Sequence, residues 1–280
     1  MPLVGTGTIV TPAARAGHGV GAFNVVQLEH AEAIVAGAET AGAPVILQIS
    51  ENTVRYHRAL APLGAATLAV ARAARVPVAV HLDHATSADL VHEAVEAGFS
   101  SVMYDASTLP YGKNVRATAR LAARCHSAGV WVEAELGAIG GKDGVHAPGA
   151  RTDPAEAAAF VTATGVDALA VAVGTSHAMA TRTARLDLPL IAALRRAVPV
   201  PLVLHGSSGV ADDGLAAAVG HGMTKVNIAT RLNRVFTSAA RTALDADRAL
   251  ADTRRYLGAA RDAMTLEVAR LLALLRAARP

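Results

Sequence analysis

Three histidines, His84, His177 and His205, stand beside glycine, aspartate or hydroxyl residues at the ends of apolar runs. Three converging imidazoles with one open position make a catalytic zinc site, whereas a structural site uses four protein ligands. A lone histidine at a strand end is more often a hydrogen-bonded rim residue, so the prediction depends on all three converging. Seven other histidines lack this setting and are interpreted as surface or helix residues: His18, His30, His57, His92, His126, His146 and His221.

Carboxylates accompany these histidines. Asp83 precedes His84 and shares the inward parity of His81, so it suits a general acid or base near the metal, or a partner that orients an imidazole. Glu133 and Glu135 also share one parity, because alternate residues of a strand face the same side. Together with Asp105 they could form a second cation site, or they could be buried hydrogen-bonded carboxylates.

Small and hydroxyl residues follow the last two apolar runs, at 206–209 and 227–230. In parallel barrels, backbone N–H groups and a helix N-terminus after strands seven and eight commonly bind phosphate. A glycine- and serine-rich turn is weak evidence alone, but its position here favours a phosphate site.

Eight apolar runs must position these residues, and helical patterns alternate with them. Near-continuous Val, Ile, Leu and Ala is typical of parallel strands buried on both faces. The runs are 21–24, 44–50, 77–83, 100–105, 130–137, 168–174, 201–206 and 224–230. The helical patterns between them include 28–41, 63–74, 87–97, 115–128, 154–164 and 190–197.

This alternation predicts an α/β fold, a (β/α)8 TIM barrel that spans 1–280 as one domain. A doubly wound sheet is the structural alternative, but the first run lacks the glycine-rich turn that such folds use for dinucleotides. Helical sequence continues over 232–246 and 255–277. These extra C-terminal helices suggest an oligomer interface, such as that of a homodimer or homotetramer.

Composition excludes several classes of function. The chain has 280 residues, 52% of them hydrophobic, and only 3% aromatic residues. Scattered basic residues and so few aromatic side chains argue against nucleic-acid binding. No apolar stretch of about twenty residues is present, so no membrane span is expected. With no secretory signal and one cysteine, Cys125, a cytoplasmic location is expected.

At this point the motifs are similar to those of a known family over nearly the whole chain. The sequence resembles the class II fructose- and tagatose-bisphosphate aldolases. The matching motifs are AFN at 22–24, HLDH at 81–84, SVMYDAS at 101–107, VEAELG at 132–137, VGTSH at 173–177, PLVLHG at 201–206 and KVNIAT at 225–230. The glutamate motif and the histidine set together are highly specific.

The resemblance implies a role for each matching residue. His84, His177 and His205 would bind the catalytic zinc, and Asp83 would handle the proton of the C4 hydroxyl. Asp105 and Glu135 stay the candidate ligands of the second cation site inferred from the residues above. A nearby monovalent cation, Na⁺ or K⁺, would accompany the C1 phosphate. Substrate-binding residues would be Asn24, Ala178, Gly206, Ser207, Ser208, Asn227, Ala229 and Thr230, with Ser50 and Arg254 at the distal phosphate. In relatives that arginine can come from a neighbouring subunit.

Three departures from the family pattern matter. The loop 140–144 is shorter and lacks the usual glutamate, which leaves Asp143 as the candidate base for the C3 proton. Ala178 stands where glycine is usual, and its expected phosphate contact is through the backbone. Ala229 replaces the aspartate of fructose-type members, which favours the tagatose-type branch.

The expected function is zinc-dependent, reversible cleavage of a ketose 1,6-bisphosphate to dihydroxyacetone phosphate and glyceraldehyde 3-phosphate. Another phosphorylated ketose or sugar acid that yields dihydroxyacetone phosphate is one alternative. A Schiff-base aldolase is a second, although only Lys225 among three lysines lies on a predicted strand. A non-catalytic barrel that binds sugar phosphates is a third, because the loop glutamate is missing.

Overall fold

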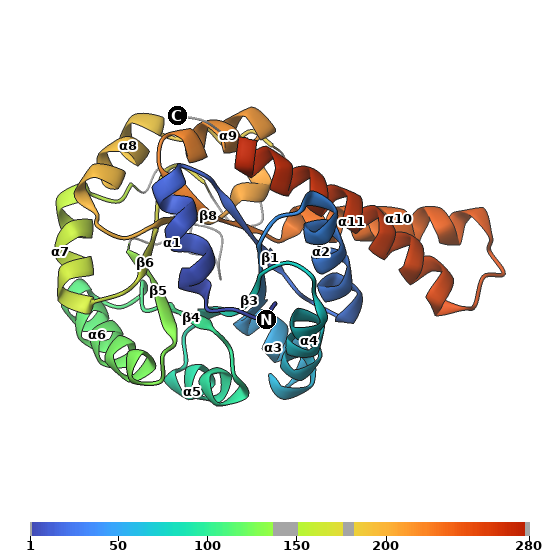
Figure 1. The fold of residues 1–280 in the computed structure, drawn as a ribbon, viewed down its shortest axis with the longest axis horizontal. Helices are drawn as coiled ribbons and strands as arrows, with labels where there is room; N and C mark the ends of the chain where they lie inside the picture. The colour runs from blue at the N-terminus through green and yellow to red at the C-terminus, as the bar shows by residue number, and fades with distance from the viewer. Residues whose placement is uncertain (1, 137–150, 176–181, 278–280) are drawn as a thin grey trace.

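A computed structural model describes residues 2–136, 151–175 and 182–277. Within these residues, parallel strands pair in chain order and β1 pairs with β8, so the sheet closes into a barrel (Figure 1). The predicted (β/α)8 barrel is confirmed. The strands are β1 (Val20–Asn24), β2 (Val45–Ser50), β3 (Val78–Ala85), β4 (Ser101–Tyr104), β5 (Trp131–Leu136), β6 (Ala168–Val171), β7 (Leu202–Leu204) and β8 (Met223–Ile228).

Helices surround the barrel and match the predicted patterns closely where glycine or a capping side chain marks an end. Asp153 accepts hydrogen bonds from two backbone N–H groups and begins α7, while Gly42 in the left-handed region ends α2. The helices are α1 (Thr6–Ala16), α2 (Leu28–Ala41), α3 (Glu51–His57), α4 (Ala61–Ala73), α5 (Ala88–Ala97), α6 (Tyr111–Ser127), α7 (Pro154–Thr164), α8 (Leu188–Ala197), α9 (Asp212–Gly220), α10 (Thr230–Ala246) and α11 (Thr253–Ala277), with a 3₁₀ turn η1 (Ser207–Gly209).

Helix α1 was not among the predicted patterns, and it covers the N-terminal end of the barrel. Ile9 and Val10 pack against Val20, Ile46 and neighbouring residues near the beginnings of the first three strands. This apolar layer excludes water from the lower half of the barrel, so the polar residues of the strands face one another in a dry interior.

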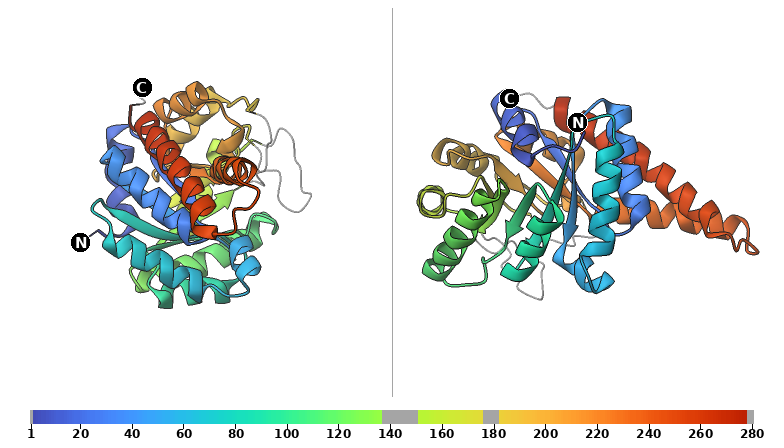
Figure 2. Two further views of the ribbon diagram at one scale, coloured as in Figure 1. Left: turned by 90° about the vertical axis from the view of Figure 1, so that its right-hand side faces the viewer. Right: turned by 60° about the horizontal axis from the view of Figure 1, so that its bottom comes forward.

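The two C-terminal helices form a long hairpin that projects beyond the barrel (Figures 1 and 2). Helix α11 returns along α10 and packs against α2, where Gly37 permits a close approach. A Cβ atom on Gly37 would lie 2.7 Å from the Thr265 carbonyl oxygen and from Val268 Cβ. No helix in the described parts of the chain is long and apolar enough to cross a membrane.

Candidate active site

The end of β3 presents two consecutive side chains to the same place. The pairing of β3 with β4 shifts register between Leu82 and Ala85, and His84 has φ of 52°. A histidine in the left-handed region is uncommon and strained, and it breaks the strand alternation that would send neighbouring side chains to opposite faces. Asp83 and His84 are therefore both buried at the C-terminal end of the barrel, with Oδ1 and Nε2 3.8 Å apart.

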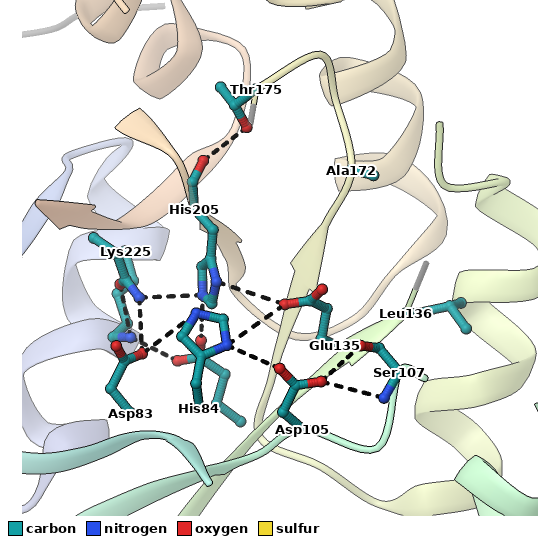
Figure 3. Close-up of polar contacts among 12 residues, drawn as sticks. Asp83, His84, Asp105, Ser107, Glu135, Leu136, Ala172, Thr175, His205 and Lys225 are labelled. Carbon is teal, nitrogen blue, oxygen red and sulfur yellow. Dashed lines mark hydrogen bonds and ion pairs between the residues drawn. The ribbon is translucent and has the colours of Figure 1, made fainter. Parts of the chain in front are cut away.

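His205, at the end of β7, completes a compact group with these two residues (Figure 3). One donor atom from each of Asp83, His84 and His205 lies within 4.8 Å of the others, and the two imidazoles meet edge to face with centroids 4.5 Å apart. Two imidazoles and a carboxylate are donors that zinc accepts, so the residues present fit such an ion.

A second group surrounds the other edge of His84. Nδ1 of His84 lies 3.0 Å from Asp105 Oδ2 and 4.0 Å from Glu135 Oε2. Asp105 in turn accepts hydrogen bonds from the backbone N–H and the hydroxyl of Ser107. Donor atoms of His84, Asp105 and Glu135 also lie within 4.8 Å of one another, so these carboxylates either orient the imidazole or hold a second cation.

Two amide side chains hold the Asp83 carboxylate, one on each oxygen. Asn24 Nδ2, from β1, donates to Oδ2 over 3.2 Å, and Asn227 Nδ2, from β8, donates to Oδ1 over 3.3 Å. Asn24 is itself fixed by Gln48, whose Nε2 donates to its side-chain oxygen. These two hydrogen bonds fix the orientation of the Asp83 carboxylate.

Fully buried polar residues lie among these groups inside the barrel. Lys225 Nζ lies 2.8 Å from Glu133 Oε2 and donates to Asn227 Oδ1 over 2.9 Å. Burial alone would raise the pKa of Glu133, but the Lys225 ammonium and the His205 contact outweigh it and hold that pKa at about 2. Glu133 is thus a hydrogen-bonded carboxylate rather than a neighbour of Asp105.

Two fully buried histidines, His81 and His205, have lowered pKa values. Burial, followed by the nearby His84, lowers the pKa of His205 to about 4. Burial, followed by the Lys225 charge, lowers the pKa of His81 to about 3, while His81 Nδ1 lies 2.7 Å from the Ser101 hydroxyl. Neutral imidazole is the form that coordinates a metal ion.

The segments predicted to bind phosphate meet above β7 and β8. Gly206 has φ of 67° and begins η1, while the Ser207 hydroxyl donates to the Asn227 carbonyl oxygen. Ser208 Oγ accepts from the Arg231 backbone N–H, which ties η1 to the N-terminal turn of α10 at Thr230. Ala229 occupies the position immediately before α10 and lacks a capping side chain.

Other predicted residues lie apart from the group or outside the described residues. Ser50 caps α3 by accepting from the Thr53 N–H. Arg254, with 89% of its side chain exposed, is paired with Asp252 on the first turn of α11, at the outer end of the hairpin. His177, Ala178 and Asp143 fall outside the described residues. Thr175, the last described residue before His177, lies beside the site, because its hydroxyl donates to the His205 carbonyl oxygen over 2.7 Å.

The structure identifies residues that the sequence prediction did not place in the site. Gln48 and Lys225 were predicted only as strand residues. A sequence motif does not show whether a buried polar residue holds a neighbouring site residue through a hydrogen bond, as these two do. Lys225 is enclosed and ion-paired with Glu133, and an ammonium group is not a nucleophile. This position disfavours the Schiff-base alternative.

Comparison with known proteins agrees with this geometry. The family model described as "Fructose-bisphosphate aldolase class-II" matches residues 4–279. A fructose-bisphosphate aldolase of Thermus caldophilus is 40% identical over 92% of this chain and 93% of its own.

Solved structures show the same fold. The YdjI aldolase of Escherichia coli K12 has a TM-score of 0.87 with 30% identity, covering 99% of this chain and 98% of its own. A fructose-bisphosphate aldolase of Campylobacter jejuni has a TM-score of 0.82 over 98% of this chain and 95% of its own. At 22% sequence identity, this likeness shows the shared fold only. The chain therefore belongs to the class-II fructose-bisphosphate aldolase family and is an aldolase, a carbon–carbon lyase.

Proposed function

We propose that the chain reversibly cleaves a ketose 1,6-bisphosphate to dihydroxyacetone phosphate and glyceraldehyde 3-phosphate, with zinc held by His84, His177 and His205. The observation that carries the proposal is the grouping of Asp83, His84 and His205 at the C-terminal end of the barrel. Thr175, two residues before His177, bonds to the His205 backbone, which supports the third ligand. When bound, zinc supplies a Lewis acid that draws electron density from the ketose carbonyl.

Asp83 is the proposed base for the C4 hydroxyl. Its carboxylate is buried and fixed by Asn24 and Asn227, so it meets a substrate hydroxyl without first losing a disordered water shell. The proton of the C4 hydroxyl passes to Asp83 as the C3–C4 bond breaks. Asp143 is proposed to protonate C3 of the three-carbon fragment, in place of the absent loop glutamate.

The C1 phosphate is proposed to bind between η1 and the N-terminus of α10. Gly206, Ser207 and Ser208 bring backbone and hydroxyl groups to this position, opposite Thr230. Helix N-termini favour anions because their first N–H groups have no partner within the helix. A monovalent cation near this phosphate and a further cation position at Asp105 and Glu135 belong to the same proposal.

The distal phosphate is assigned to Ser50 and to Arg254 of a second subunit. Within one chain Arg254 lies at the outer end of the projecting hairpin, so it needs a neighbouring barrel to meet a substrate. A homodimer or homotetramer formed through the hairpin would supply that barrel. Arginine suits a terminal phosphate because its fork can donate two charge-assisted hydrogen bonds.

Tagatose 1,6-bisphosphate is proposed as the preferred substrate, ahead of its fructose isomer. The support is Ala229, which places no carboxylate beside Asn227 and Thr230. The name of the Thermus relative supports fructose as the alternative sugar. A ketose monophosphate or sugar acid remains the second alternative, since the η1 and α10 contacts require only the dihydroxyacetone phosphate half.

The test compares kcat/KM for tagatose 1,6-bisphosphate, fructose 1,6-bisphosphate and fructose 1-phosphate in wild type and Arg254→Ala. The proposal expects the bisphosphates to be cleaved best and to lose this advantage in the variant. Arg72→Ala, an exposed arginine on α4, is the matched control. Equal cleavage of fructose 1-phosphate, unaffected by Arg254→Ala, would remove the distal phosphate site from the account.

A further inference from the structure

Lys225 is a buried cation with two partners on opposite sides. It lies on β8 with no exposed surface, and its Nζ is 2.8 Å from Glu133 Oε2 and 2.9 Å from Asn227 Oδ1. Both partners also contact residues of the candidate active site. The lysine therefore contacts one side chain next to His205 and another next to Asp83.

The contact between Glu133 and His205 sets which ring nitrogen carries the proton. Glu133 Oε1 lies 3.0 Å from His205 Nε2. Asn227 Nδ2 lies 3.1 Å from the same ring nitrogen. An ionised carboxylate only accepts hydrogen bonds and binds an N–H more strongly than an amide nitrogen binds a lone pair, so we assign the N–H to Nε2 and the lone pair to Nδ1. Nδ1 is turned to the opposite edge of the ring, 3.6 Å from Glu135 Oε2. Such carboxylate partners orient metal-binding imidazoles and increase their basicity.

The contact between Lys225 and Asn227 sets which way that amide points. An ammonium group only donates, so the oxygen of Asn227 must face Lys225. The amide nitrogen then faces the site, 3.3 Å from Asp83 Oδ1. Without Lys225, both orientations of the Asn227 amide would be available, and one of them would place two oxygens against each other at Asp83.

We propose that Lys225 is a positioning residue whose ammonium group, held between Glu133 and Asn227, fixes His205 in the Nε2–H tautomer and directs the Asn227 amide nitrogen at Asp83. The part of this inference that concerns metal affinity rests on the proposed zinc site. The part that concerns the tautomer does not.

Stability alone is a weak reason for such a pair. Burying a lysine and a glutamate removes both from water, and apolar residues of similar size often give equal or greater stability. The neighbouring interior positions Met103, Ala168 and Val203 are apolar, so this barrel accommodates aliphatic packing. What an apolar pair could not supply is an acceptor for His205 and a donor for Asn227.

The experiment uses the full chain in three forms: wild type, the double variant Lys225→Met with Glu133→Gln, and Lys113→Met as an exposed control on α6. The double variant keeps side-chain volume and leaves no unpaired buried charge. ¹⁵N chemical shifts of the His205 ring in metal-free protein report the tautomer, with the signals assigned by their loss in His205→Asn. Zinc affinity is measured by competition with a chromophoric chelator.

We expect a single Nε2–H tautomer in wild type and in Lys113→Met. In the double variant we expect a mixture of tautomers and zinc binding weakened by about 10- to 100-fold, with native circular dichroism retained. A wild-type His205 that carries its proton on Nδ1 would overturn the inference, whether or not any variant folds. So would a folded double variant with wild-type tautomer and zinc affinity. If wild type binds no zinc, the proposed function fails, and the tautomer measurement still judges Lys225.

Discussion

At the residue scale, the proposed function assigns metal binding and proton transfer to neighbouring side chains. The bulge at the end of β3 sends Asp83 and His84 in one direction, where a regular strand would part them. His84 faces Asp105 through Nδ1, whereas Asp83 is held by two amides. Each can therefore be altered with limited effect on the other.

Asp83→Asn is expected to keep zinc binding and lose most turnover. The asparagine preserves the shape of the site but cannot accept the C4 hydroxyl proton, and general acid–base groups contribute about 10²- to 10⁴-fold. Steady-state kcat and zinc content measured on one preparation check this. Asp89→Asn, on the exposed side of α5, should change neither quantity. An unchanged kcat in Asp83→Asn would leave that carboxylate a structural role only.

Asp143→Ala is expected to slow exchange of solvent protons into dihydroxyacetone phosphate. Asp143 is the only carboxylate in the segment 140–149, where the family usually has a glutamate. Proton exchange reports the C3 protonation step separately from bond cleavage. Deuterium incorporation followed by NMR is the measurement. An exchange rate equal to that of wild type would place the base elsewhere.

At the scale of elements, the packing of α2 against α11 joins an early helix to the last described helix of the chain. We expect Gly37→Ala to destabilise the fold by about 1 kcal/mol, because the new Cβ would meet backbone at 2.7 Å and this overpacking exceeds the gain in helix propensity. Gly258→Ala is the matched control in α11, where a Cβ meets nothing within 4 Å. It should stabilise by about 0.5–1 kcal/mol. Urea unfolding of both variants is the measurement, and a Gly37→Ala as stable as the control would show that α11 shifts freely.

His81 on β3 and His205 after β7 predict a pH dependence of stability in the metal-free protein. Folding lowers the pKa of His81 to about 3 and of His205 to about 4, so below pH 6.5 the unfolded chain binds more protons than the native chain. Stability is therefore greatest above pH 6.5 and falls towards pH 4, by up to about 1.4 kcal/mol per pH unit for each histidine.

Chemical unfolding between pH 4.5 and 7.5 tests this expectation, with His81→Gln as the comparison. That variant retains one of the two histidines, so its slope below pH 6.5 should be shallower. A slope equal to that of wild type would mean that His81 does not titrate on unfolding.

Strands and helices were predicted correctly from the sequence where a single local pattern, such as an apolar run or a helix cap, determines the element. Buried parallel strands read as apolar runs, so the eight strands were predicted within a few residues, and α7 was predicted with its observed bounds because Asp153 and Pro154 mark its start. The positive φ of His84 was not predictable, because no glycine or asparagine signals it. The roles of Lys225 and Gln48 were missed because they depend on side-chain contacts between different strands.

At the scale of the whole molecule, the hairpin of α10 and α11 is the feature that the barrel alone does not explain. We expect the protein to be a homo-oligomer in which the hairpin brings Arg254 to the barrel of a partner. Arg254→Ala should lower kcat/KM for bisphosphates by about 10- to 100-fold, the effect of losing charge-assisted hydrogen bonds. That its location is cytoplasmic and that 1–280 form one domain stay predictions.

Subunit mixing tests the shared site directly. Arg254→Ala lacks the donated arginine and His205→Ala lacks a zinc ligand, but a mixed dimer of the two contains one complete site. Activity towards the bisphosphate should therefore rise when the two variants are unfolded and refolded together. Sedimentation as a monomer, or no recovery on mixing, would contradict the shared site.

Zinc bound by the histidines above the barrel is proposed to be required for cleavage of a ketose bisphosphate. The most direct measurement is cleavage of tagatose and fructose 1,6-bisphosphate by chelator-treated protein during stepwise addition of zinc, with His205→Ala beside wild type. We expect no cleavage without metal, recovery of activity that saturates at one zinc per chain, and no recovery in the variant. Full cleavage by the metal-free wild type would contradict it.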